Sequence, residues 1–358
     1  MSRAFVQREM AAVTGGSRPD GGRSAAAGSY PIYAALDLGT NNCRLLMARP
    51  SRDGFRVVDA FSRIVRLGEG LGATRYLAEA AIERTIEALK ICRGKMDHRG
   101  VTRARLIATE ACRAAGNNLD FIARVELETG LHLEIIDRET EAVLAASGCA
   151  ALADPDAESV VLFDIGGGST EIVWLDRADQ ARKTVRSRIR EWSSLPVGVV
   201  NLAERHGGRH VTPAIYAAMV GEVEDLLIPF VTALGGARLP HKFHLLGTSG
   251  TVTTLAGVHL GLPRYDRRQV DGIWMSNTEI GAIIDRLLGM SFQEREASAC
   301  IGAERADLVL SGCAILDAIR NVFPTDRIRV ADRGLREGIL MQLMAEDGVW
   351  PQTQAGVL

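Results

Sequence analysis

The 358-residue sequence predicts an α/β protein made of two similar domains. Residues 33–49 and 159–175 share one order: an apolar run, an aspartate, a glycine-containing turn, small polar residues and a second apolar run. Each segment is typical of a strand, a turn and a second strand. Strand-to-helix transitions follow both segments, and the length allows two domains that each bury a core. The repetition therefore predicts a duplicated domain whose glycine turns face each other across a cleft.

The composition narrows the class of protein. Apolar residues make up 47% of the sequence, but no apolar run approaches the roughly 20 residues that a membrane helix needs. The formal charge of −2 provides no overall attraction for a polyanion. Six cysteines without paired or metal-binding spacing indicate free thiols in a reducing compartment. We therefore expect a soluble, cytoplasmic protein with neither a nucleic-acid nor a membrane partner.

The chain divides into four predicted parts. Residues 1–29 are rich in Gly, Ser, Ala and Arg and lack the apolar core of a signal peptide, so we predict a disordered tail. The first domain is expected over residues 30–145 and the second over residues 146–346. The last helix of the second domain is expected to pack back on the first, and residues 347–358 to form a short tail.

The second repeated unit has the features of a phosphate site. Its first strand is apolar except for Asp164, and a buried strand rarely tolerates an unpaired carboxylate, so we expect this acid at the functional end of the strand. The turn that follows lets backbone N–H groups approach an anion and adds two hydroxyls, through Gly166, Gly167, Gly168, Ser169 and Thr170. A plain hairpin turn would have the same sequence, and this unit alone leaves both interpretations open.

The first repeated unit favours phosphate binding because it is a second copy of the same pattern. Facing glycine turns can grip a chain of phosphates from both sides. Two aspartates, Asp37 and Asp164, are then placed to hold Mg²⁺ directly or through water. The residues of the first turn are Gly39, Thr40, Asn41 and Asn42.

The rest of the first domain alternates strands and helices. The sequence predicts a pair of strands over 55–65, a helix over 78–96 and a strand over 104–108. Arg113 follows that strand, and ligands in α/β sheets gather beyond the carboxyl ends of strands, so its guanidinium is a candidate phosphate clamp. An ordinary surface arginine on a helix fits equally well.

A further strand ending near Ile136 leads into an Ala-rich helix whose first turn contains Glu139 and Glu141. Acids in a first helical turn complement the helix dipole, which is one interpretation. The other is a carboxylate at the rim of a site, able to take a proton from water that attacks a terminal phosphate. The residues alone leave both open.

The second domain continues with a strand predicted over 184–192. It places Arg186, Arg188 and Arg190 on one face, which favours a solvated face over a path for a polyanion. A helix over 304–322, a strand over 327–330 and a closing helix after residue 332 are predicted further on.

A third glycine element lies between these segments. An apolar strand breaks at Gly247, and a helix that starts near Thr251 points its N-terminus at the turn, which makes an anion site of Gly247, Ser249 and Gly250. A plain strand-to-helix connection would have a similar sequence.

In their order and spacing, these motifs resemble the exopolyphosphatase and guanosine pentaphosphate phosphohydrolase (Ppx/GppA) family. That family lies within the group of actin-like, sugar-kinase-like and chaperone-like ATPases. The resemblance rests on Asp37-Leu-Gly-Thr-Asn-Asn, Arg113-Ala-Ala-Gly-Asn, residues 139–142, Asp164-Ile-Gly-Gly-Gly-Ser-Thr-Glu, Gly247-Thr-Ser-Gly-Thr and Leu335-Arg-Glu-Gly.

The resemblance implies two ribonuclease-H-like α/β domains that hold phosphate between them. It implies Glu141 as the catalytic glutamate, Arg113 as a phosphate-site arginine, and metal binding by Asp37, Asp164 and Glu171. Mg²⁺ is the expected cofactor, with Mn²⁺ as an alternative and a monovalent cation such as K⁺ as a further candidate. Two departures matter: Thr140 stands where the family commonly has a first glutamate, and the sequence contains no His-Asp dipeptide of the kind found in the helical module of longer members, so we expect the short two-domain form.

The predicted activity is Mg²⁺-dependent hydrolysis of the terminal phosphate of inorganic polyphosphate. Hydrolysis of guanosine pentaphosphate is the nearest alternative, because both substrates end in the same anhydride. An ATP-using kinase or ATPase of the same fold, and a sensor that binds guanosine penta- or tetraphosphate without cleaving it, are the other candidates. The glycine turns have no obvious base-stacking aromatic residue beside them in sequence, which favours polyphosphate. A homodimer is a candidate assembly.

Overall fold

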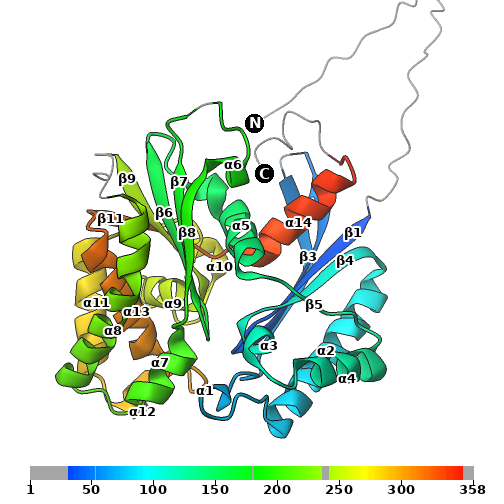
Figure 1. Cartoon of the computed structure of the whole chain (residues 1–358), viewed down its shortest axis with the longest axis horizontal. Coiled ribbons are helices and arrows are strands. Elements are labelled where there is room, and N and C mark those ends of the chain that lie inside the picture. Colours follow the sequence, from blue (N-terminus) through cyan, green and yellow to red (C-terminus); the bar gives the residue numbers. More distant parts are fainter. Residues whose placement is uncertain (1–30, 53, 180, 236–241, 350–358) are drawn as a thin grey trace, which may run out of the picture. The chain divides into compact units, whose positions relative to one another are not determined.

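Two mixed β-sheets organise the chain, and the computed structural model describes them over residues 31–52, 54–179, 181–235 and 242–349. The first sheet has the order β3-β2-β1-β4-β5 (Figure 1). Strand β2 pairs antiparallel with both β1 and β3, whereas β4 runs parallel to β1 and β5 parallel to β4. The strands are β1 Ile32–Leu38, β2 Asn42–Ser51, β3 Gly54–Ile64, β4 Val101–Ala108 and β5 Glu134–Ile135.

The second sheet repeats this plan in the order β10-β11-β9-β6-β7-β8. Strand β6 takes the place of β1, because it pairs antiparallel with the next strand, β7, and parallel with β9. One additional strand, β10, pairs antiparallel with β11 at the edge. The common plan confirms the predicted duplication of an α/β domain. The strands are β6 Ser159–Ile165, β7 Thr170–Asp176, β8 Ile189–Leu195, β9 Phe243–Thr248, β10 Trp274–Ser276 and β11 Arg327–Ala331.

Helices cover the outer face of the first sheet. We define the first lobe as this sheet with α2 (Glu79–Arg99) and α4 (Asn118–Thr129). Helix α2 places Ile82, Ile86 and Leu89 at helical spacing in one apolar core with β1 and β2. Strand β1 is buried except at Asp37, as expected for a central strand that is covered on both faces.

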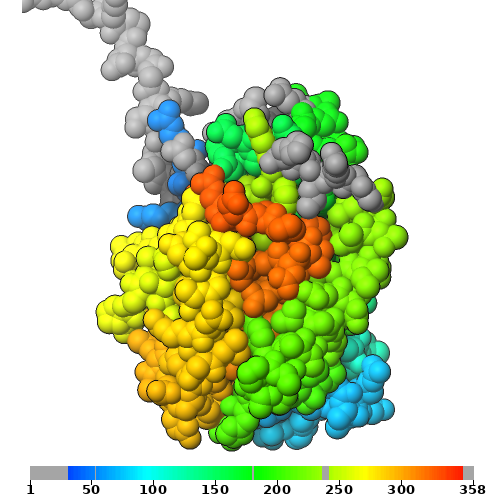
Figure 2. Space-filling view, turned by 90° about the vertical axis from the view of Figure 1, so that its left-hand side faces the viewer, coloured from blue at the N-terminus to red at the C-terminus, as the bar shows by residue number. Residues whose placement is uncertain are grey.

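The second lobe has a thicker helical layer. We define it as the second sheet with α8 (Pro213–Ala233), α9 (Ser249–His259), α11 (Asn277–Gly289), α13 (Val309–Val322) and the segments that join these elements. Figure 2 shows this helical face, with green α8 beside the yellow and orange segments that follow it in the chain. The remaining helices are α1 Leu71–Thr74, α3 Glu110–Ala114, α6 Val185–Arg188, α7 Val199–His206, α10 Arg267–Val270, α12 Phe292–Ala297 and a 3-10 turn at Ala150–Leu152.

Two helices are exchanged between the lobes. Helix α5 (Arg138–Cys149) follows the first sheet in the chain, yet its Ala146 and Cys149 pack in an apolar cluster with β6 and β7. Helix α14 (Leu335–Glu346) follows the second sheet, yet its Ile339 packs in a cluster with β1 and β2. Both helices lie between the two sheets (Figure 1).

Glycines let these two helices cross closely. A Cβ atom on Gly148 of α5 would lie 1.9 Å from the carbonyl oxygen of Gly334. A Cβ atom on Gly338 of α14 would lie 2.0 Å from the carbonyl oxygen of Leu144. Because both obstacles are backbone atoms, neither position can hold a side chain without displacing the facing helix.

Three predicted elements differ from the structure. The residues over 55–65 form the single strand β3, because this segment pairs with β2 along its length. The helix predicted from residue 304 begins at Val309, after turns that include Gly302 at φ 74°. The segment 184–192 begins with α6 instead of a strand, because the Thr184 and Ser187 hydroxyls cap that helix reciprocally.

The predicted row of arginines is therefore absent. Arg186 lies on α6 and pairs with Glu139, whereas Arg190 lies on β8 and pairs with Asp176. Arg186 and Arg190 each have their own carboxylate partner, and Arg188 Nε donates to Arg182 O at 2.8 Å, so these residues do not form a continuous path for a polyanion.

The predicted domain limits remain a prediction. The boundary between residues 145 and 146 falls inside α5, the helix that packs on the other lobe. The tail predicted over 1–29, and residues 350–358 of the second predicted tail, lie outside the described residues. Within the described part of the chain, no helix is both long enough and apolar enough to span a bilayer.

Candidate active site

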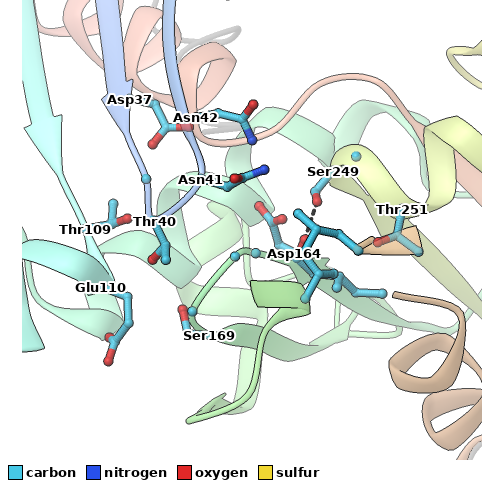
Figure 3. Close-up of a pocket in the computed structure, with 18 of the residues that line it drawn as sticks. Asp37, Thr40, Asn41, Asn42, Thr109, Glu110, Asp164, Ser169, Ser249 and Thr251 are labelled. Atoms are coloured by element: carbon cyan, nitrogen blue, oxygen red, sulfur yellow. Dashed lines mark hydrogen bonds between the residues drawn. The ribbon is translucent and has the colours of Figure 1, made fainter. Parts of the chain in front are cut away.

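Both glycine turns line one cavity beyond the carboxyl ends of β1 and β6 (Figure 3). A Cβ atom on Gly167 would lie 3.0 Å from Thr40 Cβ, and one on Gly168 would lie 2.7 Å from Thr40 Oγ1. The turns approach each other this closely because these positions have no side chain. The structure therefore brings the two predicted turns together.

Five backbone N–H groups of the two turns have no acceptor among the described residues, whereas those of Gly39 and Gly166 donate to Asn42 O and Ser169 O. The carbonyl groups of the first turn are held from outside the cavity, since Gly68 N donates to Thr40 O and Val65 N to Asn41 O, each at 2.9 Å. Convergent free amides with small side chains are typical of an anion site. In the described part of the chain, no acceptor is found for the N–H groups of Thr40, Asn41, Gly167, Gly168 and Ser169.

The N-terminus of α9 forms a third wall. Ser249, Gly250 and Thr251 line the cavity, and the N-cap residue Thr248 makes no side-chain cap to this 11-residue helix. The Ser249 hydroxyl instead donates to Ile165 O, which ties the helix start to the end of β6. The first-turn amides of α9 therefore face the cavity without a side-chain acceptor.

Five carboxylates from five elements line the cavity: Asp37, Glu110, Glu141, Asp164 and Glu171. Burial, with repulsion from Glu171, raises the pKa of Asp164 to about 7. Burial also raises the pKa of Asp37, of Glu171 and of Glu141, and the Glu171 charge adds to the rise at Glu141. A cation bound among these acids would relieve their repulsion.

Arg113 orients Glu141. Its Nη2 atom lies 2.7 Å from Glu141 Oε2 and 2.9 Å from Glu110 Oε2, and its Nη1 atom donates to Ile136 O at 2.9 Å. With these partners Arg113 does not line the cavity. Arg113 therefore contacts Glu141, the predicted catalytic acid. It does not lie at the cavity wall, where a phosphate clamp was predicted.

Two other predicted phosphate ligands do not line the cavity. The Thr170 hydroxyl is buried and donates to Val197 O at 2.7 Å. Gly247 is a packing glycine, because a Cβ atom there would lie 2.5 Å from the ring of Phe163. The lining residues that the sequence did predict are Asp37, Gly39, Thr40, Asn41, Asn42, Glu141, Asp164, Gly166, Gly167, Gly168, Ser169, Glu171, Ser249 and Gly250.

Two arginines that the sequence reasoning missed line the cavity from opposite lobes. Arg44 lies on β2, across the ladder from Asp37. Strand alternation could have found it, since Arg44 is two residues after Asn42 on the same face. Arg305 precedes α13 and donates to Thr254 Oγ1 at 3.3 Å, and no motif marks it in the sequence. Other unpredicted lining residues are Thr109, Glu110, Ile165, Val199, Thr251, Thr254, Leu308, Val309 and Leu335.

The donor set suits a hydrated hard cation. No group of three or more His, Cys, Asp or Glu among the described residues is arranged to hold a metal ion, so Asp37, Asp164 and Glu171 do not form a closed site. Mg²⁺ characteristically takes one or two carboxylates and completes its shell with water and substrate phosphate. The side-chain Oδ1 atoms of Asn41 and Asn42 are buried at the same cavity and have no hydrogen-bond partner among the residues that the structure describes, so they are further oxygen ligands of the appropriate kind.

Comparison with known proteins finds a match to the model of the Ppx/GppA phosphatase family over residues 47–347. Exopolyphosphatase 2 of Mycobacterium tuberculosis is 30% identical over 325 residues, which cover 87% of this chain and 98% of that protein. A guanosine-5'-triphosphate,3'-diphosphate pyrophosphatase of Aeromonas salmonicida is 26% identical over 324 residues, covering 88% of this chain and 60% of that protein.

Some relatives are longer proteins. A bifunctional 3-dehydroquinate synthase/phosphatase of Fusobacterium nucleatum is 28% identical over 320 residues, and the chain spans 46% of its length. Among solved structures, the Ppx/GppA family member of Aquifex aeolicus superposes with a TM-score of 0.71 at 29% identity, covering 88% of this chain and 98% of that one.

Proposed function

The chain belongs to the Ppx/GppA phosphatase family, and from this membership we propose that it hydrolyses the terminal phosphoanhydride bond of inorganic polyphosphate. The observation that best supports this is the convergence of free backbone N–H groups from two facing turns and the start of α9 on one cavity. Such donors suit the oxygens of a terminal phosphoryl group.

The carboxylates and arginines support a hydrolytic mechanism. Glu141 is our candidate base: burial and the Glu171 charge raise its pKa, which makes it a stronger proton acceptor for the attacking water. Arg113 holds the Glu141 carboxylate in place through the 2.7 Å ion pair. The turn amides stabilise the charge that spreads over the phosphoryl oxygens as the bond to the remaining chain breaks.

A divalent cation completes this proposal. When bound, Mg²⁺ would neutralise negative charge on the phosphate oxygens, and Asp37, Asp164 and Glu171 are the residues we propose to hold it, directly or through water. Its removal by a chelator should abolish phosphate release, and Mg²⁺ or Mn²⁺ should restore it. The measurement is orthophosphate release after EDTA treatment and metal titration, in K⁺ and in Na⁺ buffers. Full activity in the chelated protein would refute the metal assignment.

The lining of the cavity favours polyphosphate over a nucleotide. None of the described lining residues is aromatic, so a guanine base would find no stacking surface there. Arg44 and Arg305 instead place one guanidinium from each lobe beside the turns, where the next phosphates of a chain would lie. Guanosine pentaphosphate hydrolysis remains the second candidate, because a similar protein from Aeromonas salmonicida is named a guanosine-5'-triphosphate,3'-diphosphate pyrophosphatase.

One assay compares the candidates. We expect orthophosphate release from long polyphosphate and from tripolyphosphate to exceed release from guanosine pentaphosphate at equal concentration and with Mg²⁺ present. Faster release from guanosine pentaphosphate would make the alternative the better assignment. Tight binding of guanosine tetraphosphate without any release would indicate a sensor, and transfer of label from ATP to an acceptor would indicate a kinase.

A further inference from the structure

A short segment holds the first glycine turn from behind. We define the brace as residues 65–70, between β3 and α1. Arg66 N donates to Asn41 O at 3.0 Å, beside the bonds from Val65 and Gly68 described above. A Cβ atom on Gly68 would lie 2.3 Å from Thr40 Cγ2, so brace and turn are in direct contact. The first turn therefore cannot shift without moving the brace.

The same brace contacts the second lobe at two points. Arg66 Nη1 lies 3.0 Å from Asp307 Oδ2, and Arg66 Nη2 lies 3.2 Å from Asp307 Oδ1, which is two-point guanidinium–carboxylate geometry. Arg66 Nη2 also donates to Glu304 O at 3.2 Å. Independently, Gly70 N donates to Glu204 Oε1 at 2.9 Å.

Both contacts reach parts that form the second half of the cavity. Glu204 lies on α7, the helix whose Val199 N and Val200 N donate to Gly166 O and Gly167 O of the second turn, at 3.0 and 2.8 Å. Asp307 directly precedes Leu308, which lines the cavity. A continuous series of contacts therefore runs from the first turn through the brace to the second turn.

The backbone of Arg66 indicates how firmly this position is held. Its φ of 48° lies in the left-handed region, which costs a non-glycine residue energy. Such a conformation persists where the surroundings impose it. At Arg66 they do so through its own N–H bond to Asn41 and its guanidinium bonds to the second lobe.

We propose that Arg66 is a positioning residue, which with Asp307 and Glu204 forms a latch that holds the two glycine turns at phosphate-binding distance before substrate arrives. Substrate that contacts both turns would itself hold them together. A broken latch therefore lowers the fraction of molecules ready to bind, which raises KM while kcat changes little. This kinetic consequence depends on the proposed function, whereas the effect on lobe separation does not.

The kinetic test uses Arg66→Gln and Asp307→Asn with tripolyphosphate as substrate. We expect KM to rise by about 2- to 5-fold in each variant, the scale of one partly exposed ion pair, with kcat within about twofold. The charge-swapped double variant, Arg66→Asp with Asp307→Arg, should return KM towards the parent value. Aspartate tolerates the left-handed backbone at position 66. Arg93→Gln removes an ion pair to Asp97 and a hydrogen bond to Gly130 O, both inside the first lobe, and should change neither constant.

The structural test measures lobe separation without any activity. The six native cysteines are all buried, so spin labels can be placed at Glu83→Cys on α2 and Asp225→Cys on α8, both exposed. We expect a single narrow distance distribution that broadens to longer distances in Arg66→Gln and narrows again in the charge-swapped variant.

Glu204→Ala removes the contact between Glu204 and Gly70 N and leaves Arg66 intact. Both tests can therefore be carried out on this variant if Arg66→Gln fails to fold. Unchanged distances and unchanged KM in the folded variants would overturn the latch. Broadened distances in a protein that hydrolyses no phosphoanhydride would support the latch and refute the proposed function.

Discussion

Glu141→Gln is expected to reduce the turnover number for orthophosphate release by about 10²- to 10⁴-fold, the usual loss when a general base is removed. The substitution keeps the shape of the side chain and removes its ability to accept a proton. Tripolyphosphate binding should stay within about threefold, because the binding groups we propose are the turn amides rather than this carboxylate. Steady-state rates and calorimetric titration of tripolyphosphate measure the two effects separately.

Glu139→Gln is the matched control for this variant. Glu139 occupies the same helical turn of α5, but it is exposed and pairs with Arg186 outside the cavity. We expect it to keep parent turnover. Near-normal turnover in Glu141→Gln, or a large loss in Glu139→Gln, would contradict the assignment of the base.

Gly338→Ala is expected to destabilise the protein by about 3 kcal/mol or more, at the upper end of the cost of overpacking a core. The added methyl group would lie 2.0 Å from the carbonyl oxygen of Leu144, so α5 and α14 would have to separate. Gly148→Ala should act similarly, since its Cβ would meet Gly334 O at 1.9 Å. The shift of the urea unfolding midpoint, with the slope of the transition, measures the loss.

Gly94→Ala provides a control of opposite sign. Gly94 lies inside α2, and a Cβ atom there would meet nothing within 4 Å. This variant should be stabilised by roughly 0.5 to 1 kcal/mol, because alanine is the better helix former. If Gly338→Ala and Gly94→Ala shift the urea midpoint in the same direction, the close crossing of α5 and α14 is not the reason that position 338 requires glycine.

The sequence could predict the parts of the site that depend on short, contiguous motifs. The two glycine turns and their aspartates follow from a strand, a turn and a strand in order, and duplication implied that the turns meet. Tertiary contacts decided the rest. Arg113 points at Glu141 and Glu110 because both acids lie beside it in the folded chain. Gly247 lacks a side chain because the ring of Phe163 occupies that space, which no local pattern reveals.

Arg305 and the brace contribute to the site, but no local sequence motif predicts either of them. Arg305 lies in an irregular stretch before α13, and only the folded arrangement brings it to the cavity opposite Arg44. The pairing of Arg66 with Asp307 likewise joins residues with no shared motif. Helix α6 begins at the Thr184–Ser187 capping box, a helix signal that is present in the sequence and that takes precedence over the strand predicted there.

The exchange of α5 and α14 affects how fragments of the chain would fold. If the polypeptide were cleaved in the loop between α5 and β6, each fragment would leave the inner surface of one sheet bare while carrying the helix that belongs on the other. Fragments produced separately would then be prone to aggregate, whereas fragments produced together in one cell could complement each other. The two halves of the chain therefore depend on each other to fold, because each supplies a helix that completes the apolar core of the other.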